Sequence, residues 1–126
     1  MTLEVTKHFK DRCKSRLGIS KKDAIKYFNR AFAYGLRKSD FQHNRLFLSY
    51  LRHLMDGGEG IDCIVYNHYI IIMKKKFNGN YVAITILHVP PEYLNIVDMT
   101  KERKIRNAKR KRNFPKRYSE RKASEC

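Results

Sequence analysis

The densest run of apolar, β-branched and aromatic positions in the chain lies between residues 61 and 89, and turn residues divide it into three stretches. Asn67-His68 separates the first two stretches, and Asn78-Gly79-Asn80 separates the second from the third. Asn and Gly tolerate the positive φ angles of tight hairpin turns. The pattern therefore predicts a three-stranded antiparallel meander with strands over residues 61–66, 69–76 and 81–89.

Helical periodicity precedes this sheet. A first helix is expected between Thr6, a candidate N-cap, and Gly18, a candidate left-handed C-terminal residue. Its predicted buried stripe repeats every four residues and consists of Phe9, Cys13 and Leu17. One residue back, at the same spacing, lies a cationic row of His8, Arg12 and Arg16.

A second helix is expected to end at Gly35, with an apolar face made of Ala24, Ile25, Phe28, Ala31 and Phe32. Residues 39–55 fit a helix, although their aromatic content also allows a strand. Pro90-Pro91 before Glu92 is typical of a helix start. The order predicts an α+β fold in which two or three N-terminal helices pack on the meander. We expect a compact domain over residues 1–98 and a C-terminal basic helix or tail over 99–126.

A two-residue Asn67-His68 turn assigns each strand residue to a face of the sheet. It pairs Tyr66 with Tyr69, and we expect the wholly apolar face to lie under the helices; that face consists of Ile61, Cys63, Val65, Ile70 and Ile72. The other face carries two phenols, and it is either a binding surface or covered by the C-terminal helix; its residues are Asp62, Ile64, Tyr66, Tyr69, Ile71 and Met73.

The position of Thr85 depends on the second hairpin. A two-residue Asn78-Gly79 turn sets Thr85 opposite Ile72 on the expected core face, whereas a three-residue loop sets it opposite Met73 on the tyrosine face. The turn signal and His88 favour the first register. We favour the second, because three-residue loops with Gly are common hairpin connections.

The net charge of the chain indicates what kind of partner it binds. The 126 residues hold 28 Lys and Arg against 12 Asp and Glu, a net charge of +16 with pI ≈ 10.0. From Lys101 to Cys126 there are twelve cations and three Glu, a net +9. Such a charge repels itself in a compact chain, so it predicts a polyanionic partner, nucleic acid first and an anionic membrane surface second.

The sequence shows few signals for a membrane span, a disulfide pair or a metal site. No apolar run reaches the ~18 residues that span a bilayer, and the charged N-terminus is unlike a signal peptide. The three cysteines form no C-x-x-C pair, and the histidines show no metal-ligand spacing. We expect a cytoplasmic protein with reduced thiols, no cofactor, no metal and no membrane partner.

The motif T-x-H-F-x-x-R-x-x-x-R (Thr6, His8, Phe9, Arg12, Arg16), together with the final strand A-I-T-I-L over residues 83–87, supports a family resemblance. These residues resemble small phage- and prophage-type proteins of the RelE-like, barnase, EndoU and colicin class of metal-independent ribonuclease and toxin folds. The resemblance covers roughly residues 5–95. It implies RNA across the open side of the sheet and a catalytic set of His8, Arg12 and Thr85. In RelE-type enzymes, however, much of the catalytic set sits on the strands and the C-terminal segment.

Metal-free RNA cleavage needs proton-transfer groups and a cation for the phosphorane charge, which His and Arg supply. A basic, exposed helix face is the other interpretation of His8 and Arg12. Further candidate nucleic-acid-binding residues are cations and aromatics, namely Arg16, Tyr66, His68, Tyr69, Lys74, Lys75, Lys76, Lys109, Arg110, Lys111, Arg112, Lys116 and Arg117.

The sequence thus predicts a protein that binds RNA or a ribonucleoprotein, with toxin-like endoribonuclease activity left open. Two alternatives are a non-enzymatic, phage-type inhibitor of a host defence nuclease, similar to an anti-CRISPR protein, and a ribosome-associated basic protein. All three are consistent with the same charge.

Overall fold

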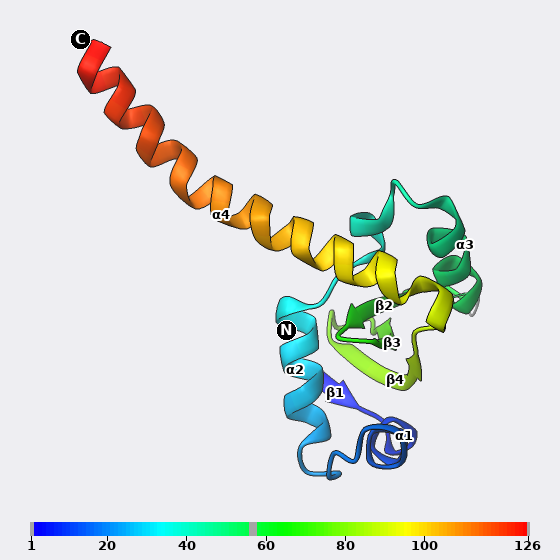
Figure 1. Ribbon diagram of the computed structural model, residues 1–126. Helices are drawn as coiled ribbons and strands as arrows, with labels where there is room; N and C mark the ends of the chain where they lie inside the picture. Colours follow the sequence, from blue (N-terminus) through cyan, green and yellow to red (C-terminus); the bar gives the residue numbers. More distant parts are fainter. Residues whose placement is uncertain (1, 56–57, 126) are drawn as a thin grey trace. The chain divides into compact units, whose positions relative to one another are not determined.

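The computed structural model describes residues 2–55 and 58–125, with side chains described as far as Lys109. The chain divides into two units, Met1–Leu94 and Asn95–Cys126. The first unit holds a four-stranded sheet in the order β1-β4-β3-β2, built from Leu3–Val5, Ile61–Tyr66, Tyr69–Lys75 and Tyr81–His88 in chain order (Figure 1). The predicted three-stranded antiparallel meander is therefore wrong: the fold is α+β, but its sheet is mixed and has a fourth strand.

The additional strand is β1, which runs parallel to β4 with Leu3 opposite Tyr81 and Val5 opposite Ala83. Three residues are too short for a period-two pattern to be recognised. Its pairing partner lies far along the chain, so no local turn signal marks the contact either.

The first hairpin has the predicted register, with Tyr66 opposite Tyr69, Val65 opposite Ile70 and Cys63 opposite Ile72. Asn67 adopts a φ of 54°, the left-handed conformation expected of Asn in this turn.

The second hairpin contains a β-bulge. Ile72 pairs with Thr85 but Met73 pairs with Ala83, so Ile84 is the extra residue on β4. The register that places Thr85 opposite Met73 is therefore wrong. Beyond the bulge β4 faces β3 as the shorter turn would have placed it, and His88 lies opposite Tyr69.

Between β1 and β2 the described residues form four helical segments. Helix α1 (Lys7–Leu17) is capped by the Thr6 hydroxyl, which accepts from the Phe9 amide at 3.1 Å, and it ends at Gly18 with φ 69°. Helix α2 (Ala24–Tyr34) ends at Gly35. Residues 39–55, which also allowed a strand, form the 3-10 helix η1 (Lys38–Phe41) and helix α3 (Arg45–Leu54). The 3-10 helix η2 (Pro91–Tyr93) then leads into α4 (Leu94–Glu125).

A buried hydrophobic cluster joins α1 and α2 to one face of the sheet. It contains Phe9, Cys13, Ala24, Phe28 and Ala31 from the helices, and Ile64, Ile71, Met73, Ala83 and Ile86 from the strands. Tyr66 and Tyr69 pack against the same cluster, and the Tyr66 ring meets Tyr27 edge-on at 5.4 Å.

The helices therefore cover the face that carries the tyrosines, and the expected assignment of the two faces is inverted. The opposite face is also buried where it carries Cys63, Val65 and Ile70. Because both faces are apolar, alternation along the strands could not tell which of them meets α1 and α2.

Candidate nucleic-acid interface

The end of the β3–β4 hairpin gathers Lys74, Lys75 and Lys76 beside Phe77 and Asn78, and we call these five residues the hairpin end. Backbone hydrogen bonds close its loop, from the Lys76 amide to the Asn80 carbonyl at 2.7 Å and from the Gly79 amide to the Lys76 carbonyl at 3.0 Å. Gly79 supplies the positive φ, 85°, that the loop requires.

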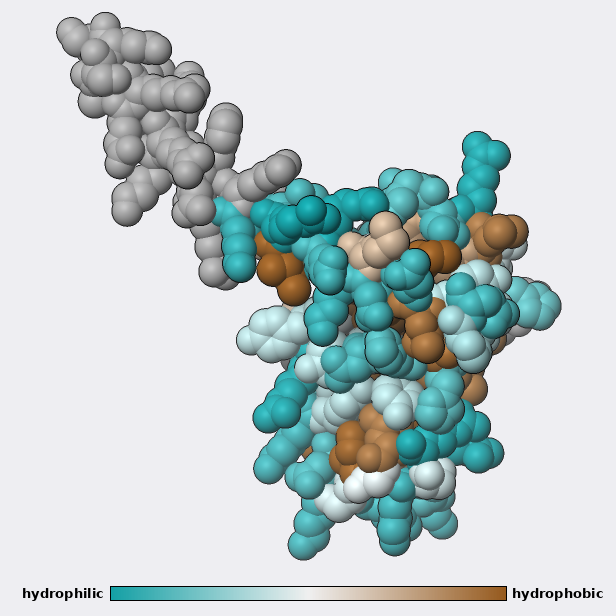
Figure 2. Space-filling model, viewed as in Figure 1, coloured by the Kyte–Doolittle hydropathy of each residue, from teal (hydrophilic) through white to brown (hydrophobic). Residues whose placement is uncertain are grey.

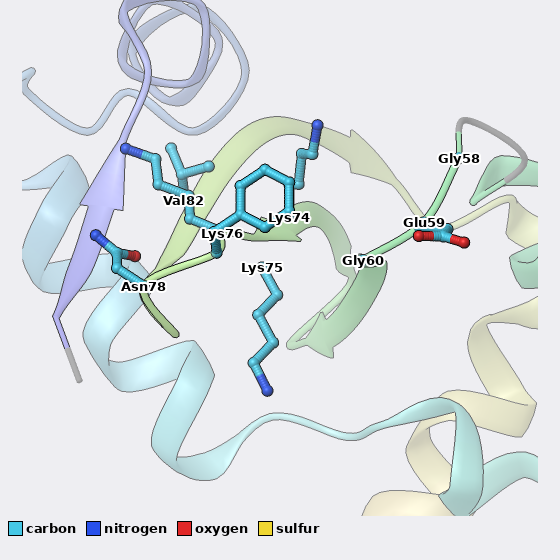
Figure 3. A pocket seen from close by; sticks show the side chains of 9 residues that line it. Gly58, Glu59, Gly60, Lys74, Lys75, Lys76, Asn78 and Val82 are labelled. Carbon is cyan, nitrogen blue, oxygen red and sulfur yellow. The ribbon is translucent and has the colours of Figure 1, made fainter.

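A hollow of about 810 Å³ lies against the hairpin end, between it and the glycine loop that precedes β2 (Figure 3). Its wall consists of Gly58, Glu59, Gly60, Val82 and the five residues of the hairpin end. Gly60, with φ 79°, brings the loop against β3, where its carbonyl accepts from the Lys75 amide at 2.8 Å. A Cβ on Gly60 would lie 3.0 Å from the Lys75 carbonyl oxygen, so glycine allows this close approach.

The three lysines have different surroundings. The Lys76 ammonium lies 3.0 Å from the Glu4 carboxylate, and the Lys75 ammonium lies 6.0 Å from the centre of the Tyr81 ring. Lys74 is exposed and has no ion-pair or aromatic partner within residues 2–55 and 58–109. Figure 3 shows the three side chains pointing in different directions. The hairpin end therefore offers a spread of positive charge, which suits a polyanion better than one small anion.

Phe77 was not among the residues predicted from the sequence, although the three lysines before it were. Its side chain is fully exposed (113% of the reference area), the highest value among the exposed large apolar residues of the described chain. The signal was available, because an aromatic residue immediately before Asn-Gly has no neighbouring strand position to bury it. The face seen in Figure 2 is mostly hydrophilic, with apolar residues in separate patches.

The cationic row on α1 is exposed at His8 and Arg12, but Arg16 has a structural role. Arg12 donates to His8 at 3.5 Å and both side chains are exposed, as the spacing predicted. Arg16, in contrast, donates to the Ile86 carbonyl. Thr6 donates to two further carbonyls of β4, from its amide to Ala83 at 3.0 Å and from its hydroxyl to Ile84 at 3.1 Å. Thr6 and Arg16 together satisfy the edge of β4 beyond the short strand β1.

The proposed catalytic set is not brought together. Directly paired residues point to the same side of a sheet, so Thr85 shares the face of Ile72, while α1 packs on the face of Ile71 and Met73. Thr85 is thus separated by the sheet from His8 and Arg12. The bulge at Ile84 is the physical reason.

The remaining candidates divide by exposure. His68 is exposed at its turn, whereas Tyr66 and Tyr69 are half-buried, and the Tyr69 ring lies 4.9 Å from that of His88. The tyrosines are thus partly used in packing. Lys109 is exposed on α4, but the side chains of five further candidates, Arg110, Lys111, Arg112, Lys116 and Arg117, lie outside the described residues.

Burial shifts the pKa values of the two described cysteine thiols. It raises the pKa of Cys13 to about 11 and, with the nearby negative charge of Asp62, that of Cys63 to about 12. Within the described residues no group of three His, Cys, Asp or Glu side chains is placed to hold a metal ion, and no helix there has the length and apolar character to cross a membrane.

Comparisons with known proteins give no relative from which a role could be transferred. No family model matches the chain, and neither a curated protein nor a solved structure matches it.

Proposed function

We propose that this protein binds RNA. The observation that carries the proposal is the hairpin end, where three lysines with diverging side chains are among the residues that line an open hollow, together with an exposed aromatic residue. Cations that track a phosphate backbone, combined with an aromatic face, are the usual components of single-stranded nucleic-acid binding.

The charge balance supports the same function. Even if all 12 acidic residues were paired, 16 of the 28 Lys and Arg would remain without a carboxylate. Among the described acids, Asp11 is engaged by Lys21 at 3.2 Å and Glu4 by Lys76 at 3.0 Å. The excess positive charge is best compensated by an external polyanion.

We propose binding in preference to cleavage. Metal-independent cleavage of RNA requires an acid and a base on opposite sides of the reacting phosphate. His8 and Arg12 supply one candidate proton-transfer group and one cation, and the sheet separates them from Thr85. A basic helix face that contacts phosphates needs no such arrangement.

Incubation of the purified protein with total RNA in EDTA tests the proposal. We expect intact RNA that migrates as a stable, salt-sensitive complex, because phosphate contacts dominate the affinity. The absence of any complex at low salt would overturn the proposal.

The same incubation separates binding from catalysis. Fragments ending in 2′,3′-cyclic phosphate would show a ribonuclease, provided that His8→Ala lowers their formation by about 10²-fold or more. His53→Ala is the matched control, because His53 is also an exposed helical histidine, on α3. We expect neither variant to change the amount of intact RNA.

Truncation after Lys109 should weaken RNA binding and flatten its salt dependence. The removed segment holds seven Lys and Arg and two Glu, a net charge of +5. Each lost phosphate contact should reduce the slope of log K against log salt by about 0.7 for a single strand. An unchanged slope would show that residues 110–126 make no phosphate contacts.

A further inference from the structure

We propose that the hairpin end is a site for an unpaired nucleotide, with the base stacked on Phe77 and the neighbouring phosphate held by Lys74. This inference rests on the proposed function and names the substrate class, namely RNA with at least one unstacked base. It assigns base stacking and phosphate binding to two residues that line the same hollow.

Phe77 has the properties of a stacking platform. Its ring is fully exposed, and the loop that carries it is closed by the Lys76–Asn80 and Gly79–Lys76 backbone hydrogen bonds. The Asn78 side chain adds a third contact, accepting from the Asn80 amide at 3.0 Å. A ring held on a closed loop loses little freedom when a base stacks on it, and every base has a face for stacking.

Of the three lysines at this site, Lys74 is the one that we expect to bind the phosphate. It stands opposite Val82 on the next strand, and both residues line the hollow. Lys76 is engaged by Glu4 and Lys75 lies over Tyr81, whereas Lys74 has no such partner in the part of the chain whose side chains are described. Lys74 can therefore bind an anionic ligand without breaking any contact described within residues 2–55 and 58–109.

The hollow provides room beside the ring. Its volume of about 810 Å³ falls within the range of small-ligand sites, about 300–1,000 Å³. The positive rim favours an anionic occupant, and a nucleotide satisfies the ring and the cation at once.

The occupant must be unpaired. A base within a duplex has both faces covered by its neighbours, so a protein ring can stack on it only where the base is splayed out. A duplex can still contact the lysines through its phosphates, but it gains nothing from Phe77.

The test uses a property of the whole chain, which contains no tryptophan. In Phe77→Trp the introduced residue is the single indole, and a stacked base should quench its fluorescence. We expect saturable quenching by a 12-nucleotide oligouridine and none by heparin, a polyanion without bases. The matched control is Tyr34→Trp, at another exposed aromatic position (77% exposed), where oligouridine should leave the fluorescence unchanged.

Affinity measurements on the full chain complete the test. Phe77→Ala should weaken binding of the labelled oligouridine about tenfold and leave binding of a duplex of equal charge unchanged, whereas Leu46→Ala, at an exposed apolar residue on α3, should change neither. Lys74→Gln should lower the salt slope by about 0.7.

The possible failures are distinguishable. Suppose that all variants bind oligouridine tightly, and that the indole of Phe77→Trp is not quenched or is quenched no more than that of Tyr34→Trp. This result would overturn the nucleotide site and leave RNA binding in place. If the unmodified chain bound neither oligouridine nor duplex at low salt, both the site and the proposed function would fall.

Discussion

Replacing Gly35 by alanine should destabilise the protein by about 3 kcal/mol, the upper end of what an overpacked core position costs. A Cβ at Gly35 would lie 2.5 Å from the Ala31 carbonyl oxygen and would collide with Cγ2 of Ile64, which is fully buried. The backbone cannot retreat, because the Gly35 amide donates to Ala31 at 2.7 Å and Leu36 pairs with Val65. Urea unfolding followed by circular dichroism measures the loss.

Gly18→Ala is the control for this variant. Gly18 has a φ of 69°, but a Cβ there would meet nothing within 4 Å. The cost should be that of the left-handed backbone alone, about 1 kcal/mol. Equal losses at the two positions would mean that space at Gly35 is not limiting.

The free energy of unfolding should fall steeply between pH 9 and pH 11. Burial raises the pKa values of Cys13, Cys63 and Tyr27 to about 11, 12 and 12, from ordinary values of 9.0, 9.0 and 10.0. The unfolded chain loses the two thiol protons above pH 9 and the Tyr27 proton above pH 10, while the folded chain keeps them. The stability they contribute is thus fully present below pH 9 and is lost as pH rises toward the folded pKa values. The limiting slope is about 1.4 kcal/mol per pH unit for each group.

Urea titrations at pH 8 and pH 10.5 measure this effect, and Cys63→Ala identifies its source. The variant lacks the most shifted thiol, so its stability should fall less between the two pH values, whatever the substitution costs at pH 8. Loss of charge from lysines is common to both proteins and cancels in the comparison. An identical pH dependence would show that Cys63 ionises equally in both states.

Local signals in the sequence predicted the local structure. The Thr6 cap, the Gly18 terminus and the Asn67 turn each rest on chemistry within a few residues, and each is present. What failed was non-local. The parallel strand β1 has no local marker, and the choice of the face under the helices depends on packing between two equally apolar surfaces.

In the candidate site, too, the local features were predicted and the non-local ones were not. The cationic row on α1 and the lysines of the hairpin were visible as spacing and composition. The separation of Thr85 from His8 follows from one bulged residue, Ile84, which no pattern announces. Phe77 falls between the predicted strands 69–76 and 81–89 and was assigned to neither, although an aromatic residue at a turn tip is expected to be exposed.

The pairing of β1 with β4 also bears on how the chain folds during synthesis. Thr6, which follows β1, meets its partner Ile84 across 78 positions of sequence. Because β1 is synthesised before β4, it stays unpaired until β4 is made, while the β2–β3 hairpin can form on its own. Contacts of such long range slow folding and leave apolar segments exposed in the meantime. We infer that the nascent segment around β1, with Leu3, Val5 and Phe9 uncovered until β4 is made, is a part of the chain where a chaperone would assist folding.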